Sequence, residues 1–262
     1  MYQIPELQKN PKLFHAFSMK GDGNMANSIL GKVVNFENVL TNRKRFLEKI
    51  EVDIKKCICM WVTHGDEIIE VPKKSIGISM RNYKRAVKVD GLMSNEKDVY
   101  SFLLVADCLP IIFYDPKKEV VALVHAGWKG VDLEIAKKAV EKIQKEYGSK
   151  PKDIIVGVGP HAHKDSFIKE DPMQKNDPRW KSFIDRVRPC QKRGKGRYFK
   201  VDLMGFTKKQ LLDAGVRKEN IYVSDVDTVK DKRYFSHVRE KDLPIEKQGR
   251  FACVVGMAGS GS

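Results

Sequence analysis

The sequence contains no long hydrophobic run. No apolar segment approaches the roughly 18–20 residues that a membrane-spanning helix requires, so the sequence predicts no membrane partner. The first residues, Met1–Glu6, also lack the basic residues followed by an apolar stretch that are typical of a signal peptide. We therefore expect a soluble protein of the cytoplasm.

Cysteine is scarce, and its number is odd. The five cysteines are Cys57, Cys59, Cys108, Cys190 and Cys253. An odd number in a long chain without an export signal argues against a disulfide framework. We expect most of them to be reduced and buried as small hydrophobic residues. Cys57 and Cys59 alternate on a predicted strand and face one side, so we place both in the core.

Acidic residues are in the minority. Lys and Arg number 49 against 34 Asp and Glu, which gives a net charge of +15 and predicts attraction to anions such as phosphorylated small molecules or nucleic acid. Nine Lys or Arg residues and one acid, Asp185, lie between Arg179 and Lys200. We interpret this stretch as a solvated basic loop. A nucleic-acid-binding arm is the alternative, although no recognised binding motif accompanies it.

The composition is that of a folded globular protein. Hydrophobic residues make up 42% of the 262 residues, and the sequence shows no internal repeat or evident domain boundary. We therefore predict a single domain over residues 1–258. The last four residues, Gly259–Ser262, have the composition of a linker tail.

The clearest predicted elements lie in the middle of the chain. The continuous apolar run Tyr100–Val105 predicts a strand covered on both faces. Ile111–Tyr114 and Val120–Val124 are joined by the turn Asp115–Lys118 and predict a hairpin. An amphipathic helix from Val131 follows, and Gly148 is placed to cap its end.

Further strands and helices alternate along the rest of the chain. Asn42–Ile50 is predicted to be the end of a helix, and Val201–Ala214 a further helix. The predicted strands are Cys57–Thr63, Ile154–Val158, Ile221–Val223 and Phe251–Val255. Alternating strands and helices with a hairpin inserted indicate a mixed sheet in an α/β or α+β fold, rather than a purely parallel sheet.

Three residues able to bind a metal lie where predicted strands end. They are His64, Cys108 and His125, and pairing across the hairpin can bring the last two together. A thiolate and two imidazoles make a plausible zinc site with a fourth position for water or substrate. The same residues could instead provide a cysteine nucleophile with a histidine base.

The segment His125–Gly130 connects a predicted strand to a helix. Its two glycines and Lys129 precede the helix N-terminus, where free N–H groups attract anions, so a phosphate could bind there. An ordinary strand-to-helix turn is the alternative. Trp128 either packs in the core or forms an aromatic wall for a ring.

Together these segments resemble a known family. Ala106–Pro110 and His125–Gly130 are similar to the two most specific motifs of the laccase-domain, or YfiH-like, family. Weaker landmarks follow in the correct order along almost the whole chain: Phe17–Ser18, Asn42–Arg43, His64–Gly65, Asp90, Gly159–Pro160, Asp202, Phe235–Ser236, Arg239 and Gly249–Arg250.

The resemblance implies a mixed α/β sandwich and a role in purine nucleoside metabolism. Its members are described as phosphorolysing adenosine, inosine and methylthioadenosine, with adenosine deamination as a further activity. The family's zinc cluster corresponds to His64, Cys108 and His125, and Asp107 could orient one of these histidines. The candidates for binding phosphate are Lys129, Arg43, Arg239 and Arg250.

Other functions stay open. One is a cysteine-dependent amidase, or a hydrolase that edits peptidoglycan precursors, with Cys108 and His125 as its machinery. Another is a basic nucleic-acid-binding protein with a vestigial site, and a third is an inert paralogue.

The chain departs from the family pattern at Met19–Lys20, Val62, Lys129, Asp227–Thr228 and Val238–Arg239. At Val62 the usual residue is Gln, and at Lys129 it is Arg, whose bidentate fork lysine lacks.

The older label of this family, multicopper polyphenol oxidase, does not suit the histidine content. The chain has six histidines, too few for a cluster of several copper ions, which imidazoles would have to bind. Only His161–Ala162–His163 forms a His-x-His pair, which we expect to be exposed to solvent or to lie in a loop. We therefore expect one zinc ion and no copper cluster.

Overall fold

Two β-sheets pack face to face at the centre of the protein. The computed structural model describes residues 1–29, 31–187 and 196–259. The larger sheet contains, in spatial order, β14 (Ile221–Val223), β10 (Ile155–Val158), β8 (Leu109–Asp115), β9 (Val120–Ala126), β6 (Gly91–Ser94) and β5 (Ile68–Glu70). The smaller one contains β1 (Leu13–Phe17), β15 (Phe251–Met257), β7 (Tyr100–Val105) and β4 (Cys57–Cys59). Both sheets combine parallel and antiparallel pairs, as predicted.

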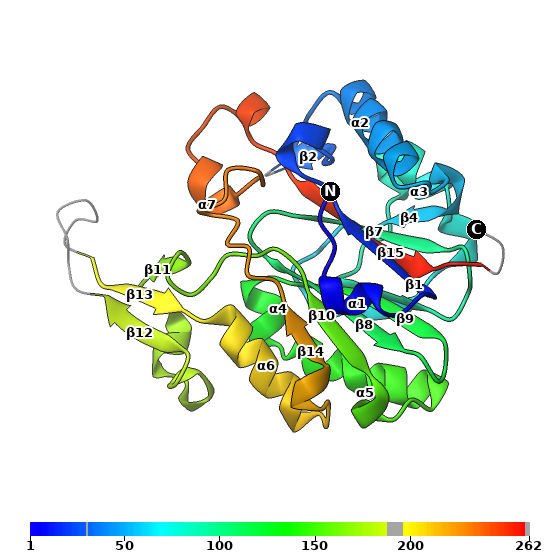
Figure 1. Ribbon diagram of the computed structural model, residues 1–262. Coiled ribbons are helices and arrows are strands. Elements are labelled where there is room, and N and C mark those ends of the chain that lie inside the picture. The colour runs from blue at the N-terminus through cyan, green and yellow to red at the C-terminus, as the bar shows by residue number, and fades with distance from the viewer. Residues whose placement is uncertain (30, 188–195, 260–262) are drawn as a thin grey trace.

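Helices cover the outer face of each sheet (Figure 1). Helices α5 (Ile135–Tyr147) and α6 (Leu203–Asp213) pack on the larger sheet, and α2 (Phe36–Lys49) and α3 (Ile78–Arg81) on the smaller one. The layers therefore run helix, sheet, sheet, helix, which confirms the expected mixed α/β sandwich. The short helices are α1 (Pro5–Gln8), α4 (Trp128–Asp132) and α7 (His237–Glu240), and β2 (Ser28–Ile29) pairs with β3 (Lys32–Val33). None of the helices in the described ranges is long and apolar enough to cross a membrane.

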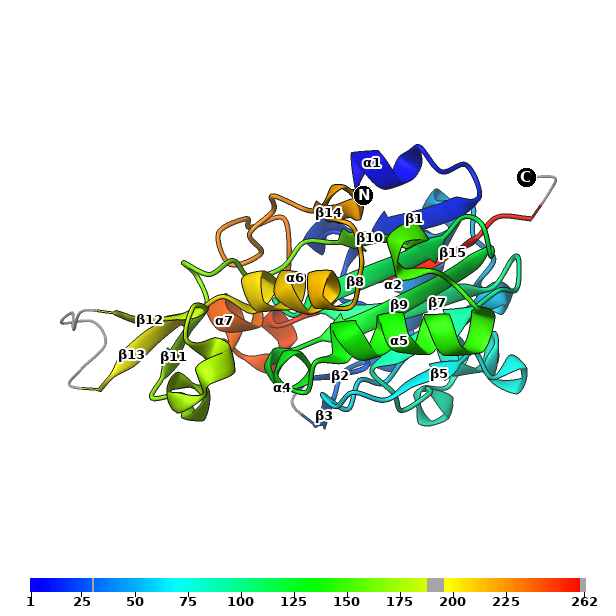
Figure 2. The same cartoon turned by 90° about the horizontal axis from the view of Figure 1, so that it is seen from below.

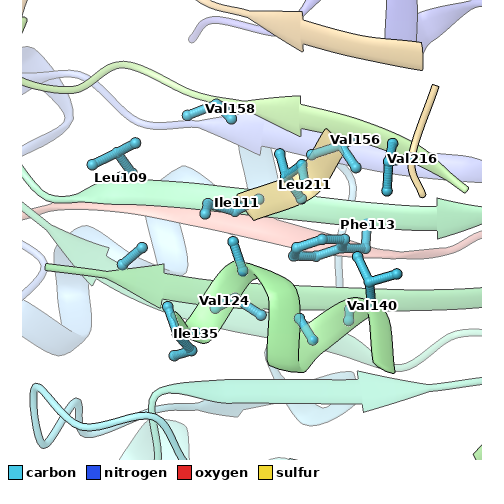
Figure 3. Close-up of a cluster of buried hydrophobic side chains, with 14 of the residues drawn as sticks. Leu109, Ile111, Phe113, Val124, Ile135, Val140, Val156, Val158, Leu211 and Val216 are labelled. Atoms are coloured by element: carbon cyan, nitrogen blue, oxygen red, sulfur yellow. The ribbon is translucent and has the colours of Figure 1, made fainter. Parts of the chain in front are cut away.

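The alternation of side chains along a strand creates the separate cores. On β8, Ile111 and Phe113 face the helices, whereas Ile112 and Tyr114 face the other sheet. Figure 3 shows the helix-side cluster, in which Phe113 lies close to Val140 of α5. Strands buried on both faces need apolar residues at every position, which is why these strands read as continuous hydrophobic runs.

The predicted hairpin is present as β8 and β9. The strands pair antiparallel from Leu109 with Ala126 to Asp115 with Val120. In the turn, Asp115 Oδ1 accepts hydrogen bonds from the backbone N–H groups of Lys117 and Lys118, at 2.8 and 3.2 Å. This register also pairs Pro110 with His125, and so places the residue before β8 close to the end of β9.

The helix predicted after the hairpin is divided in two. Helix α4 ends at Asp132, and α5 begins at Ile135 after Glu134, whose φ is 60°. Asp132 Oδ1 accepts a hydrogen bond from Trp180 Nε1 at 2.8 Å, which holds the junction against the neighbouring segment. At the other end, Gly148 adopts the left-handed conformation (φ 65°) expected of the cap.

The basic stretch contains strands rather than only a loop. β12 (Ile184–Val187) and β13 (Tyr198–Val201) pair with each other, and β11 (Ile168–Glu170) completes a small sheet that extends away from the main sheets (Figure 2). Residues 188–195, and Cys190 with them, lie outside the described part of the chain. Several cations here bind nearby acids, such as Arg197 with Asp171 at 2.9 Å.

Candidate functional site

The structure brings His64, Cys108 and His125 together. Their potential ligand atoms all lie within 4.8 Å of one another. His64 follows β4, Cys108 stands between β7 and β8, and His125 is the penultimate residue of β9. The rings of the two histidines approach edge to face, with centroids 5.0 Å apart. Three segments from both sheets thus form one cluster.

The carboxylate of Asp90 fixes two sides of this cluster. Its Oδ1 lies 2.9 Å from His125 Nδ1 and accepts a hydrogen bond from the backbone N–H of His64, also at 2.9 Å. Its Oδ2 accepts from the backbone N–H of Gly65 at 2.8 Å and from the hydroxyl of Thr63. Burial raises the pKa of this acid, but these donors outweigh burial and hold the pKa well below its usual range. Asp90 therefore stays ionised and holds His64 in its left-handed conformation (φ 57°).

Asp107 does not orient a histidine, so that expectation is wrong. Its carboxylate accepts hydrogen bonds from the hydroxyls of Thr228 and Ser236, at 2.6 and 3.0 Å, and from the backbone N–H of Val238 at 2.6 Å. Asp107 thereby ties the loop that carries Cys108 to the segment that begins α7. Asp90 takes the role that we had given to Asp107, because it lies directly before β6, the neighbour of β9.

The environment of His125 favours one tautomer. Because Nδ1 points to Asp90, Nε2 is left for the cluster. Burial lowers the pKa of His125, but Cys108 and Asp90 outweigh burial and raise the pKa to about 9. A cation is therefore electrostatically favoured at this position, whether it is a proton or a metal ion.

The donor atoms of the cluster and the distances between them suit a metal ion. One sulfur and two imidazole nitrogens are a donor set that zinc prefers, and bonds of 2.0–2.3 Å in a tetrahedron put ligand atoms about 3.5 Å apart. Separations of up to 4.8 Å can contract to that value by small side-chain rotations. Gly127 keeps the space open, because a Cβ there would lie 3.2 Å from Cys108 Sγ and 3.4 Å from His64 Cδ2.

A cavity of about 360 Å³ adjoins the cluster, within the usual size of a small-molecule site. Part of its wall is apolar and part is polar. The apolar lining includes Met60, Trp61, Val62, Ala86, Leu104, Val105 and Ala106. The polar lining includes Asn27, Arg43, His64, Ser79, Cys108, His125, His237 and Arg250.

Two of the four predicted phosphate-binding residues line this cavity, Arg43 and Arg250. Arg43 is 1% exposed and donates to the carbonyls of Met25 (2.9 Å) and Met80 (3.1 Å), while its Nη2 has no hydrogen-bond partner among the residues that the structure describes. Arg43 forms no salt bridge with any acid in the described ranges. A buried cation without a counter-charge is costly. An anionic group of a ligand would supply that charge.

The other two, Lys129 and Arg239, lie outside the lining. Lys129 is exposed on α4. The guanidinium of Arg239 donates to backbone carbonyls, among them those of Thr228 and Tyr234, and contacts Glu240 at 2.9 Å. These bonds engage Arg239 in holding the chain around α7. Of the four candidates for binding phosphate, Arg43 and Arg250 are therefore the two that line the cavity.

The sequence left alternatives open for two other residues, His161 and Trp128. His161 is buried rather than exposed: it bonds Gly159 O through Nδ1 at 2.8 Å, and burial lowers its pKa to about 4. Trp128 takes the first of its two expected roles: it packs against the core, and its ring stacks on that of Trp180, with centroids 5.4 Å apart and an interplanar angle of 13°. The aromatic residue in the cavity wall is instead Trp61, which no sequence pattern had marked.

His237 is a further polar residue that the sequence analysis missed. It lines the cavity, and its Nδ1 is buried with no hydrogen-bond partner in the described part of the chain. It stands directly after the landmark Phe235–Ser236, at the first position of α7. That position was the available signal, because Ser236 caps the helix and fixes the residue that follows it.

Comparison with known proteins agrees with the fold and the motifs. A family model described as "Multi-copper polyphenol oxidoreductase laccase" matches residues 24–258. Proteins called "Purine nucleoside phosphorylase YlmD" from Bacillus subtilis (strain 168) and Geobacillus stearothermophilus are 30% and 32% identical over 230 residues. These matches cover 84% of this chain, and 77% and 78% of the relatives.

Solved structures show the same likeness. The crystal structure of YlmD from Geobacillus stearothermophilus has a TM-score of 0.81 at 28% identity, covering 95% of this chain and 93% of that one. That of the Bacillus licheniformis hypothetical protein YfiH has a TM-score of 0.80 at 26% identity, covering 94% and 93%. Because the family model matches most of the 262 residues, the chain belongs to the family described as multi-copper polyphenol oxidoreductase laccase.

Proposed function

We propose that the protein is a zinc-dependent purine nucleoside phosphorylase that acts on adenosine, inosine and methylthioadenosine, with adenosine deamination as a further activity. The observation that carries this proposal is the His64–Cys108–His125 cluster beside a cavity that also contains two arginines. The relatives named purine nucleoside phosphorylase support it. Within the described ranges, this three-residue group suits one zinc ion better than a copper cluster.

The reaction needs a site that binds a nucleoside and phosphate side by side. A phosphate oxygen forms a bond to the ribose C1′ while the bond from C1′ to the purine nitrogen breaks. The purine leaves with the bonding electrons and takes up a proton. Arg250 and the free Nη2 of Arg43 can attract the phosphate. His237 Nδ1 can hydrogen bond to a ligand in the same cavity.

The cluster would hold zinc through His64, Cys108 and His125. When bound, the zinc supplies a Lewis acid that can polarise a substrate oxygen or lower the pKa of water. Asp90 keeps His125 in the tautomer that presents Nε2, and it holds the backbone around His64. Two of the three cluster residues are thus arranged before any ligand arrives, which reduces the cost of ordering the site.

Zinc content and phosphate-dependent base release should be measured together. We expect the wild type to contain about one zinc ion per chain and to release base from adenosine, inosine or methylthioadenosine only when phosphate is present. Cys108→Ala should lose both properties. Cys253→Ala is the matched control, because Cys253 is equally a free cysteine but lies between the two sheets, away from the cavity. It should keep both.

Two results would contradict the proposal at different levels. A metal-free wild type that releases no base from any of the three nucleosides would refute the function. Full activity in Cys108→Ala would refute the site while leaving the function possible. Adenosine deamination is tested separately, as ammonia release from adenosine without phosphate.

A cysteine-dependent amidase is the second candidate, because the order Asp90, His125, Cys108 matches an oriented base beside a nucleophile. Hydrolysis of an amide would not need phosphate. Release of product that is independent of phosphate, and that is lost in Cys108→Ala but resistant to chelators, would favour this candidate over phosphorolysis.

A further inference from the structure

Trp61 occupies an unusual place for a tryptophan. It lines the cavity together with Val62 and His64, and it is the one Phe, Tyr or Trp among the described lining residues. It remains 37% exposed, whereas Trp180 is fully buried. A large aromatic side chain left open at the wall of a cavity is typical of a residue that contacts a ligand.

The backbone holds Trp61 near the His64–Cys108–His125 cluster. Its N–H donates to the carbonyl of Val87 at 2.7 Å, and the N–H of Met60 donates to that of Phe102 at 3.0 Å. Three residues later, the Asp90 carboxylate fixes His64. The Cα atoms of Trp61 and His64 are therefore at most about 11 Å apart, since an extended chain advances at most about 3.6 Å per residue.

Apolar residues lie next to Trp61 in the cavity wall. Met60 and Val62 are its chain neighbours, and the bridge between Met60 and Val87 brings Ala86 beside them; all of these except Val87 line the cavity. Val62 has an apolar side chain and so presents no polar side-chain group to the cavity. This part of the wall favours a flat, weakly hydrated ring over a charged group.

We propose that Trp61 is the platform on which the purine ring of the substrate stacks. This rests on the proposed function, since it assumes a ligand with a purine. Every base offers a π-face, so stacking tolerates different purines and suits adenine and hypoxanthine alike. With the base on Trp61, the ribose and phosphate extend toward the cluster, Arg43 and Arg250.

Kinetics of Trp61→Ala and Trp61→Phe test this role. We expect Trp61→Ala to raise the KM for adenosine and inosine by about tenfold (~1.4 kcal/mol), with the KM for phosphate, kcat and zinc content close to wild type. Trp61→Phe should stay within about threefold of wild type, because phenylalanine still stacks. A purely structural role for Trp61 would not change the nucleoside KM selectively.

Tryptophan fluorescence gives a readout that does not depend on turnover. The chain has three tryptophans, Trp61, Trp128 and Trp180. Adenosine and inosine, added without phosphate, should quench the wild type and Trp128→Phe but not Trp61→Phe. Trp128→Phe is the matched control, since it removes a tryptophan that packs in the core.

The failures of the two proposals are distinguishable. A wild type that turns over nucleosides, with an unchanged KM in Trp61→Ala or unchanged quenching in Trp61→Phe, overturns the role of Trp61 alone. A wild type that is neither quenched by purine nucleosides nor releases base from them overturns this role and the proposed function together.

Discussion

A single buried carboxylate, Asp90, organises the candidate metal cluster. Asp90 is 0% exposed, and its carboxylate contacts the ring of His125 and the backbone N–H of His64. Asp90→Asn removes the charge and keeps the size. Because such partners orient ligands and raise their basicity, we expect zinc affinity to fall by about 10- to 100-fold. Competition with a chromogenic chelator measures this change.

The matched control for Asp90→Asn is Asp115→Asn. Asp115 is also a buried acid (2% exposed) and also accepts backbone hydrogen bonds, but it does so in the hairpin turn at the far end of β8 and β9. This variant should lower the free energy of unfolding by about 1–2 kcal/mol and leave zinc affinity unchanged. Equal loss of zinc affinity in both variants would show that Asp90 acts only through stability.

At the scale of elements, the turn from β9 into α4 limits the space around the cluster. Gly127 has an ordinary extended conformation (φ −77°, ψ 176°), so alanine fits its backbone, yet the added Cβ would crowd Cys108 Sγ and His125 Cε1 at 3.2 Å. Gly127→Ala should therefore weaken zinc binding by about tenfold or more. In Gly21→Ala nothing lies within 4 Å of the new Cβ, and zinc affinity should not change.

The sequence predicted elements well where the signal was local. The run Tyr100–Val105 and the hairpin around Asp115–Lys118 are as expected, because strands buried on both faces and short turns have characteristic residues. The break of the helix at Glu134 was missed, because Asp132 there bonds Trp180, which is 48 residues away. No local pattern reports a contact of that range.

The same distinction holds for the site. The motifs located His64, Cys108 and His125, but not which acid supports them. Asp107 is adjacent to Cys108 in the sequence. Asp90 is adjacent to His125 in space, because β6 pairs with β9. Strand order depends on how the whole sheet assembles, so the pairing of Asp90 with His125 could not be read from spacing alone.

At the scale of the whole molecule, two histidines are enclosed in the fold without charge. His15 is fully buried on β1 and accepts a hydrogen bond from the backbone N–H of Ile4 at Nε2, 2.8 Å away. His161 lies beyond β10 and donates from Nδ1 to Gly159. Burial lowers the pKa of each to about 4, from an ordinary value of 6.5.

These two histidines should make the fold sensitive to mild acid. Between about pH 6.5 and pH 4, these histidines bind protons in the unfolded chain but not in the folded protein. The free energy of unfolding is therefore at its full value above pH 6.5 and falls as the pH is lowered, by up to about 3 kcal/mol per histidine. Urea unfolding from about pH 7 to pH 5, with a chelator to remove metal effects, measures the slope. His15→Gln keeps an acceptor for Ile4 and should reduce the slope by about one proton. An unchanged slope in His15→Gln would show that other groups govern the acid sensitivity.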